Sequence, residues 1–223
     1  MDNVIAIDGP AASGKSSIAE RLAERLGIPY VNTGNMYRAV TLAAMKKGFS
    51  ADAPDYGILR DVLKNISLDY VAGPDGKLVL KLDGSFVDSE IRQPEVAKCV
   101  SVVAAFPDVR EWLVERQRKF AGTGMIVMEG RDIGTVVFPN AKYKFFLTAT
   151  PEVRAVRRLK QEGESSEGAT VASVAAEIAK RDEMDMNRKV SPLKKADDAI
   201  LVDSSDMTIE QVLDFIVEHI EIN

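Results

Sequence analysis

A glycine-rich loop ending in a lysine lies close to the start of the chain. It reads Gly9-Pro10-Ala11-Ala12-Ser13-Gly14-Lys15-Ser16, with Ser17 next, and it fits the pattern G-x-x-x-x-G-K-[ST]. In this pattern, small residues let backbone N–H groups surround a polyphosphate, the lysine reaches the outer phosphates, and the serine hydroxyl can hold Mg²⁺. The loop therefore predicts a nucleoside-triphosphate site at residues 9–17.

Two sets of charged residues in the second half of the chain have helical spacing. Arg154, Arg157 and Arg158 lie at i, i+3 and i+4, and Arg181, Asp185 and Arg188 lie at i, i+4 and i+7. Each set falls on one helix face. A solvated charged face is the ordinary explanation, because surface ion pairs are common and contribute little. Near a triphosphate site, two such faces flanking the polar stretch 161–168 favour phosphoryl transfer, which needs cations and a closing lid.

Two further polar segments follow apolar, strand-like runs. Residues 32–38 (NTGNMYR) follow the run at 29–31, and residues 129–132 (EGRD) follow the run at 125–128. Ligands of open α/β sheets bind beyond the carboxyl ends of the strands. Each segment could be a plain turn, but together they place Arg38 and Arg131 near the phosphate loop. There they could hold a second substrate that carries a phosphate.

The elements that must position these residues alternate between strand and helix. Strands are expected at 4–7, 29–31, 125–128, 143–147 and 199–202, and helices at 15–26, 35–47, 54–65 and within 94–120, on both sides of 161–168, and from Thr208 to the C-terminus. This order predicts an α/β fold, a parallel, mostly doubly wound sheet flanked by helices. Residues 66–87 alternate around Gly73–Gly76, which predicts an antiparallel hairpin inserted into that fold, and 161–168 is the segment expected to be mobile.

Composition excludes several classes of function. The chain has 223 residues and a formal net charge of −5, which argues against nucleic-acid binding through a broadly basic surface. One cysteine and one histidine exclude an internal disulfide and histidine-rich metal sites, and make a histidine-based triad improbable. No apolar run approaches the roughly 18 residues that span a bilayer. A soluble, cytoplasmic protein without a membrane partner is expected.

The motifs resemble those of the bacterial cytidylate kinase family, within the P-loop nucleoside-monophosphate kinases. The resemblance runs along nearly the whole chain, through IDGPAASGKSS, TGNMYR, SEIRQPEVAKCVSVVAAFPDVRE, EGRDIGTVVFP, RRLKQEG, RDEMDMNRKVSPL and ILVDSS. It implies a P-loop NTPase-type fold in one domain, 1–223, and a monomer. Within it, about 34–105 would bind the monophosphate, including the hairpin at about 66–87, and about 154–188 would form the lid.

The resemblance also implies a reaction: transfer of the ATP γ-phosphate to CMP or dCMP with Mg²⁺. Residues 9–17 would hold the ATP phosphates. Thr33, Tyr37 and Arg38 would lie at the monophosphate, Arg131 and Arg188 would grip it, Ser101, Arg110 and Asp132 would face the cytosine, Arg181 and Asp185 would hold the ribose, and Arg154, Arg157 and Arg158 would form the lid. Many relatives have Asp-Ser/Thr-Gly-Ala where this chain has Asn32-Thr33-Gly34-Asn35, so any charge at position 32 is lost.

Residue chemistry agrees with a cytosine ligand. A carboxylate such as Asp132 accepts a hydrogen bond from the N4 amino group of cytosine and repels the O4 oxygen of uracil. No general base is required, because the acceptor is already an anionic phosphate oxygen. Two alternatives stay open: a P-loop kinase for another small acceptor, such as a different pyrimidine monophosphate, and a nucleotide-binding regulatory module without turnover. A GTPase is disfavoured because no N-K-x-D motif is evident, and a multidomain motor because the chain is short.

Overall fold

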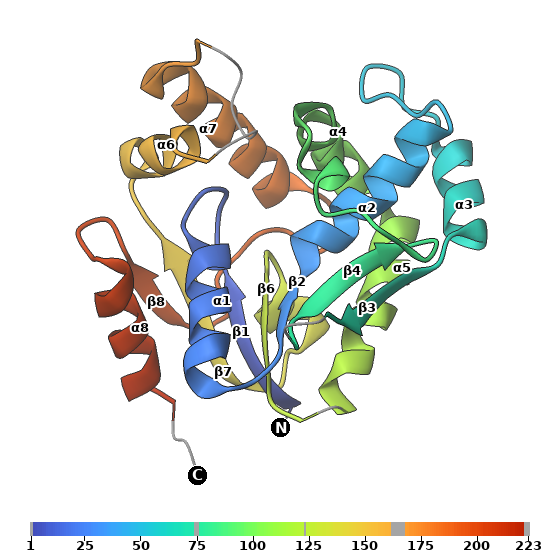
Figure 1. Ribbon diagram of the computed structural model, residues 1–223. Coiled ribbons are helices and arrows are strands. Elements are labelled where there is room, and N and C mark those ends of the chain that lie inside the picture. Colours follow the sequence, from blue (N-terminus) through green and yellow to red (C-terminus); the bar gives the residue numbers. More distant parts are fainter. Residues whose placement is uncertain (1, 74–75, 123, 162–167, 221–223) are drawn as a thin grey trace.

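The centre of the molecule is a five-stranded sheet in which every neighbouring pair is parallel (Figure 1). A computed structural model describes residues 2–73, 76–122, 124–161 and 168–220. The strands are β1 (Asp2–Asp8), β2 (Tyr30–Asn32), β6 (Ile126–Gly130), β7 (Ala141–Thr148) and β8 (Ile200–Asp203), in the order β2-β6-β1-β7-β8. All five predicted strands and the parallel arrangement are confirmed.

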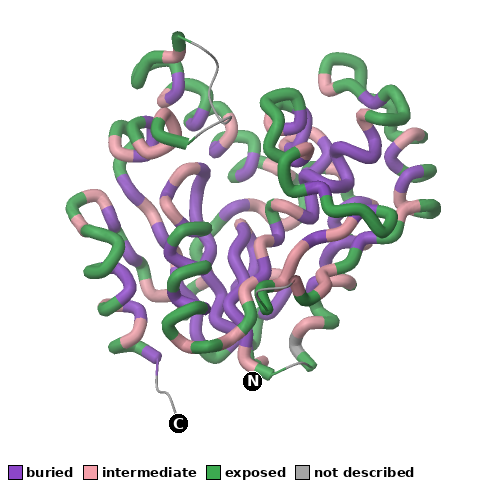
Figure 2. The backbone as a smooth tube through the Cα atoms, viewed as in Figure 1, coloured by how far each residue is buried: buried purple, intermediate pink, exposed green. Residues whose placement is uncertain are grey.

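The strands are apolar because helices cover both faces of the sheet. Along β1, Ile5 and Ile7 pack with α1 (Lys15–Leu26) and α8 (Ile209–Glu218), while Val4 and Ala6 pack on the opposite face, toward α5 (Pro107–Arg118). All four side chains are buried, and Figure 2 shows the central strands buried along most of their length. This two-sided burial explains why the runs show no polar alternation.

Helix ends follow the predicted signals in most places. α1 ends at Gly27, whose left-handed φ of 65° lets its N–H bond back to the helix carbonyls. α8 begins with the predicted capping box between Thr208 and Gln211. α2 (Thr33–Lys46) begins two residues before the expected position, because the Asn32 side chain accepts a hydrogen bond from the backbone N–H of Asn35 and caps the helix.

The region between β2 and β6 forms a second core beside the sheet. α3 (Tyr56–Asn65), α4 (Pro94–Ala105) and α5 pack with α2 around the antiparallel strands β3 (Leu68–Ala72) and β4 (Leu78–Leu82). The hairpin is confirmed, although turn residues 74–75 lie outside the described residues, and a short third strand, β5 (Ser85–Phe86), joins it. The helical stretch 94–120 divides at Phe106, because Pro107 disfavours helical backbone at the residue before it.

A pair of packed helices, α6 (Pro151–Leu159) and α7 (Val171–Asn187), lies above the carboxyl edge of the sheet in Figure 1. Most of the polar stretch expected to be mobile, residues 162–167, lies outside the described residues. Shorter helical turns span Glu90–Arg92, Lys119–Gly122 and Ile133–Val137. Among the described residues, no helix combines the length and the apolar character needed for a membrane span.

Candidate active site

A cavity of about 1170 Å³ lies at the carboxyl edge of the sheet, between the phosphate loop, α2, α4 and α7. It brings together most of the predicted site residues: Ala12, Ser13, Gly14, Lys15, Ser16, Ser17, Thr33, Tyr37, Arg38, Ser101, Arg110, Arg131, Asp132, Arg158, Arg181, Asp185 and Arg188. Gly9, Pro10, Ala11, Arg154 and Arg157 do not line it. Residues from both halves of the chain therefore meet at one site.

The loop between β1 and α1 folds around its own lysine. Lys15 is buried, and its Nζ donates to the Pro10 carbonyl oxygen at 2.6 Å and to Ser13 Oγ at 3.3 Å. Burial and the nearby Arg131 hold the pKa of Lys15 well below its usual value, against the opposing effect of Glu129. At the loop's start, a Cβ on Gly9 would lie 2.0 Å from the Leu147 carbonyl oxygen, so only glycine fits.

The arginines of α6 divide between two tasks. Arg158 lines the cavity, whereas Arg154 and Arg157 hold the outer side of the phosphate loop. Arg154 donates to the Ala11 carbonyl oxygen at 3.1 Å, and Arg157 donates to the Ser13 carbonyl oxygen at 3.1 Å and to Ser204. Of the three predicted lid arginines, the structure therefore brings only Arg158 to the cavity.

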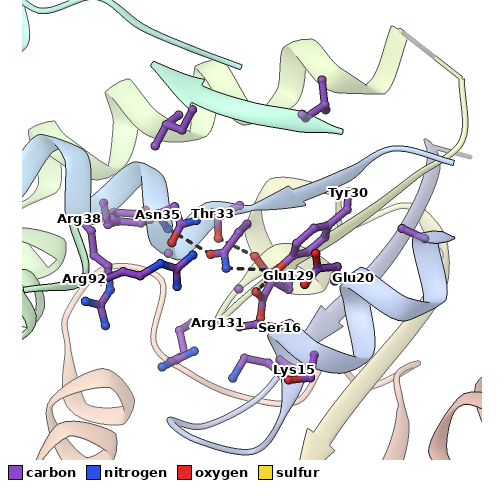
Figure 3. A pocket seen from close by; sticks show the side chains of 18 of the residues that line it. Lys15, Ser16, Glu20, Tyr30, Thr33, Asn35, Arg38, Arg92, Glu129 and Arg131 are labelled. Carbon is purple, nitrogen blue, oxygen red and sulfur yellow. Dashed lines mark hydrogen bonds between the residues drawn. The ribbon is translucent and has the colours of Figure 1, made fainter. Parts of the chain in front are cut away.

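The segment after β2 is tied to the end of β6. Thr33 Oγ1 donates to the Glu129 carbonyl oxygen at 2.7 Å, and the Tyr30 hydroxyl donates to Glu129 Oε1 at 2.5 Å. Asn32 Nδ2 in turn donates to the Tyr30 hydroxyl at 3.1 Å, and Figure 3 shows the Tyr30 and Glu129 side chains close together. Asn32, which departs from the pattern of many relatives, thus helps orient a buried carboxylate without adding a second negative charge.

Buried ion pairs also line the cavity. Arg110 donates to Asp132, and Arg188 lies 3.6 Å from the other oxygen of that carboxylate. Arg131 Nε donates to Asp185 Oδ2 at 3.0 Å. Burial by itself would raise the pKa of Asp185, but Arg131 and the other arginines beside it outweigh burial and lower it. Both carboxylates are therefore held beside cations within the cavity.

The same cavity is lined by more arginine side chains than its carboxylates can neutralise. Burial, reinforced by neighbouring arginines, lowers the pKa of Arg38 and Arg158 to about 10 and that of Arg181 to about 9. The buried Arg181 Nε and Arg188 Nη2 have no hydrogen-bond partner within the described parts of the chain. Figure 3 shows Arg38, Arg92 and Arg131 around one part of the cavity. Unused donors in a positive field suit a ligand bearing phosphate groups.

The predicted site residues did not include Glu129, Asp8 or Asp182. Glu129 lines the cavity, while Asp8 and Asp182 support it. Asp8 accepts from the backbone N–H groups of Ile133 at 2.8 Å and Gly134 at 2.7 Å, and burial raises its pKa to about 6. Asp8 and Glu129 could have been recognised from the sequence, because each is an acidic residue at the end of an otherwise apolar strand, a position that is expected to be buried.

Known proteins resemble the chain along almost its whole length. A family model described as "Cytidylate kinase" matches residues 5–222. The cytidylate kinase of Desulforamulus reducens is 48% identical over 97% of this chain and 96% of its own length, and that of Streptococcus equi subsp. equi is 45% identical over 97% and 95%. The chain belongs to the cytidylate kinase family.

This member of the cytidylate kinase family is therefore a kinase, a phosphate-transferring, nucleotide-binding enzyme. A solved shikimate kinase from Bacteroides thetaiotaomicron shares the fold, with a TM-score of 0.50 and 13% identity over 98% of each chain. At that identity the likeness concerns the fold alone. The predicted P-loop kinase fold and family are confirmed.

Proposed function

We propose that this member of the cytidylate kinase family transfers the γ-phosphate of ATP to CMP or dCMP, with Mg²⁺ bound alongside the ATP. The observation that carries the proposal is the joining of two chemistries in one cavity. The phosphate loop contributes Lys15 and Ser16, and the same cavity holds the buried Arg110–Asp132 pair. A triphosphate donor and a cytosine-bearing acceptor match these two groups.

Asp132 and its neighbours carry the base recognition. Asp132 is 4% exposed, so a hydrogen bond from the N4 amino group of cytosine would form away from competing water. Arg110 supplies donors for the O2 and N3 acceptors of the ring, and Ser101 can donate or accept. Uracil would present its O4 oxygen to the Asp132 carboxylate and would be rejected by charge and by the unpaired acceptor.

The remaining arginines would hold the phosphates and the sugar. Arg38, Arg131 and Arg188 fit the acceptor phosphate, since all three line the cavity near Thr33 and Tyr37. Arg181 and Asp185, one turn apart on α7, fit the ribose hydroxyls. Arg158, which lines the cavity, would reach the donor phosphates from α6, while Arg154 and Arg157 would act through the loop that they bond.

No residue has to remove a proton in this reaction. The attacking group is an anionic phosphate oxygen, so catalysis consists of aligning donor and acceptor and stabilising negative charge. Mg²⁺ would neutralise charge on the ATP phosphates. It prefers oxygen ligands and keeps several waters, which fits the Ser16 hydroxyl at the start of α1, with the Glu129 carboxylate lining the same cavity.

A coupled assay of ADP release tests this function. ATP is supplied with CMP, dCMP, UMP, AMP or GMP, each with Mg²⁺ and with excess chelator. We expect rapid turnover with CMP and dCMP, weak turnover with UMP, and none in chelator. Preferred turnover of AMP or UMP would retain the kinase and refute the cytosine site. An enzyme that binds nucleotides without turning over any of them would favour the regulatory module instead.

A further inference from the structure

A buried clamp holds the peptide groups of Ala11 in the phosphate loop. Asp182 Oδ1, on α7, accepts from the Ala11 backbone N–H at 2.9 Å, and its other oxygen accepts from Arg154 on α6. Arg154 closes the ring by donating to the Ala11 carbonyl oxygen at 3.1 Å and also binds the Ala149 carbonyl oxygen. Both charged side chains are buried, so water competes little for these bonds.

Ala11 faces away from the cavity, and it is the last residue of the phosphate loop to do so. Its side chain is 1% exposed and packs with Ala155, Val174 and Ile178 between α6 and α7. The next residue, Ala12, lines the cavity and has a left-handed φ of 57°, a conformation that an alanine adopts only under constraint. The clamp thus holds the loop on one side of a strained turn whose other side faces the ligand.

Helix α7, which carries Asp182, also carries two of the residues proposed to hold the acceptor nucleotide. Arg181 and Asp185 on α7 line the cavity, while Asp182 between them points the other way, toward the loop. The position of α7 and the shape of the phosphate loop are therefore linked through one carboxylate. Arg154, which does not line the cavity, takes part in that link rather than in contact with a transferred phosphate.

We propose that Asp182, together with Arg154, is a positioning residue that sets the ATP-binding shape of the phosphate loop and aligns it with α7. The proposal goes beyond the transfer reaction, and its consequence for ATP rests on that proposed function. A carboxylate is required because both of its oxygens accept. An asparagine offers one acceptor and would turn its amide donor toward either Arg154 or the Ala11 N–H.

Asp182→Asn tests the proposal, and Asp198→Asn is the matched control. Asp198 also pairs with a buried cation, Lys144, but lies outside the cavity. Hydrogen exchange is measured first on the nucleotide-free proteins. We expect faster exchange across residues 9–17 in Asp182→Asn only, with α8 unchanged. This measurement needs no ATP binding, so it decides the clamp even if the proposed reaction fails.

Calorimetric titration with ATP and, separately, with CMP gives the second measurement. Losing hydrogen bonds to a charged group predicts ATP binding weaker by about tenfold or more, with CMP binding changed by less than about threefold. In turnover, KM for ATP should rise far more than KM for CMP, and Asp182→Glu should restore part of the loss. A folded Asp182→Asn protein with normal exchange at 9–17, or with equal losses for both nucleotides, would overturn the proposal.

Should the single variant fail to fold, the double variant Asp182→Asn/Arg154→Met replaces it, because it leaves no unpaired charge in the interior. The same pattern is expected: faster exchange at residues 9–17 and a loss confined to ATP. Wild-type-like exchange in the folded double variant would overturn the clamp. A wild type that turns over ATP and CMP beside an unaffected double variant would retain the proposed function and refute the clamp alone.

Discussion

Replacing Asp132 by asparagine should shift the base preference of the enzyme from cytosine toward uracil. Asparagine has nearly the same shape, keeps one oxygen for Arg110, and places an amide donor where the second carboxylate oxygen stood. That donor opposes the N4 amino group of cytosine and matches the O4 oxygen of uracil. Because Asp132, Arg110 and Arg188 are all shielded from water, solvent cannot compensate for the mismatch.

The magnitude follows from the value of one base-edge contact, about 1–3 kcal/mol. The ratio of kcat/KM for CMP to kcat/KM for UMP should therefore fall by about 5- to 150-fold. KM for ATP should change by less than about twofold, since the donor end keeps its residues. The coupled ADP assay with both acceptors measures the ratio, and Asp198→Asn should leave it unchanged.

Stability must be measured beside specificity. Removing the Asp132 charge leaves Arg110 and Arg188 facing each other in the interior, and breaking a buried pair costs up to about 3–5 kcal/mol. The assay is therefore run well below the unfolding midpoint of the variant, determined by thermal denaturation. A folded Asp132→Asn enzyme with an unchanged CMP-to-UMP ratio would refute the assignment of Asp132 to the base.

Two other substitutions test residues that shape the backbone around the site, Gly9 and Asp8. Gly9→Ala places a Cβ 2.0 Å from the Leu147 carbonyl oxygen, so thermal denaturation should show a loss of about 1–3 kcal/mol or more, whereas Gly122→Ala, with open space at its Cβ, should be near neutral. Asp8 has its pKa raised by burial from 3.8 to about 6, so its ionisation destabilises the fold as pH rises through that range. Urea unfolding measures the free energy of unfolding of the wild type and of Asp8→Asn at pH 4 and pH 7. The wild type minus Asp8→Asn difference should be higher at pH 4 than at pH 7 by up to about 3 kcal/mol. A difference that does not change with pH would contradict a buried Asp8 that takes up a proton in this range.

Local pattern was sufficient for most of the fold. The buried strands, the Gly27 helix end and the capping box at Thr208 depend on residues that are neighbours in sequence, and each lies where the pattern predicts it. The division of residues 94–120 into two helices also has a local cause, Pro107, but the helical pattern on both sides of Pro107 concealed it. The early start of α2 depended on a side-chain cap from Asn32.

The supports of the site could not be predicted in the same way. Asp182 meets the Ala11 N–H across 171 residues, and Asp8 meets the Gly134 N–H across 126. Neither pairing leaves a periodic trace in the sequence, because it arises only when the sheet and the helix pair have assembled. Helical spacing did not separate the three arginines of α6. Arg154 and Arg157 bond the outer side of the phosphate loop, and Arg158 lines the cavity.

The charge distribution is compatible with the proposed binding of two anionic nucleotides to an acidic protein. The net charge is −5, yet arginines concentrate in the cavity, where burial and neighbouring arginines lower the pKa values of Arg158 and Arg181. Asp132 and Asp185 keep part of this charge paired before any ligand arrives. If CMP binds as proposed, its phosphate takes over Arg131 and Arg188, which frees the two carboxylates to accept from the base and the sugar. These ion pairs thus hold the two carboxylates and the arginines in position before a ligand binds. A ligand that lacks the phosphate or the matching donors would break the ion pairs and form no new interactions in their place.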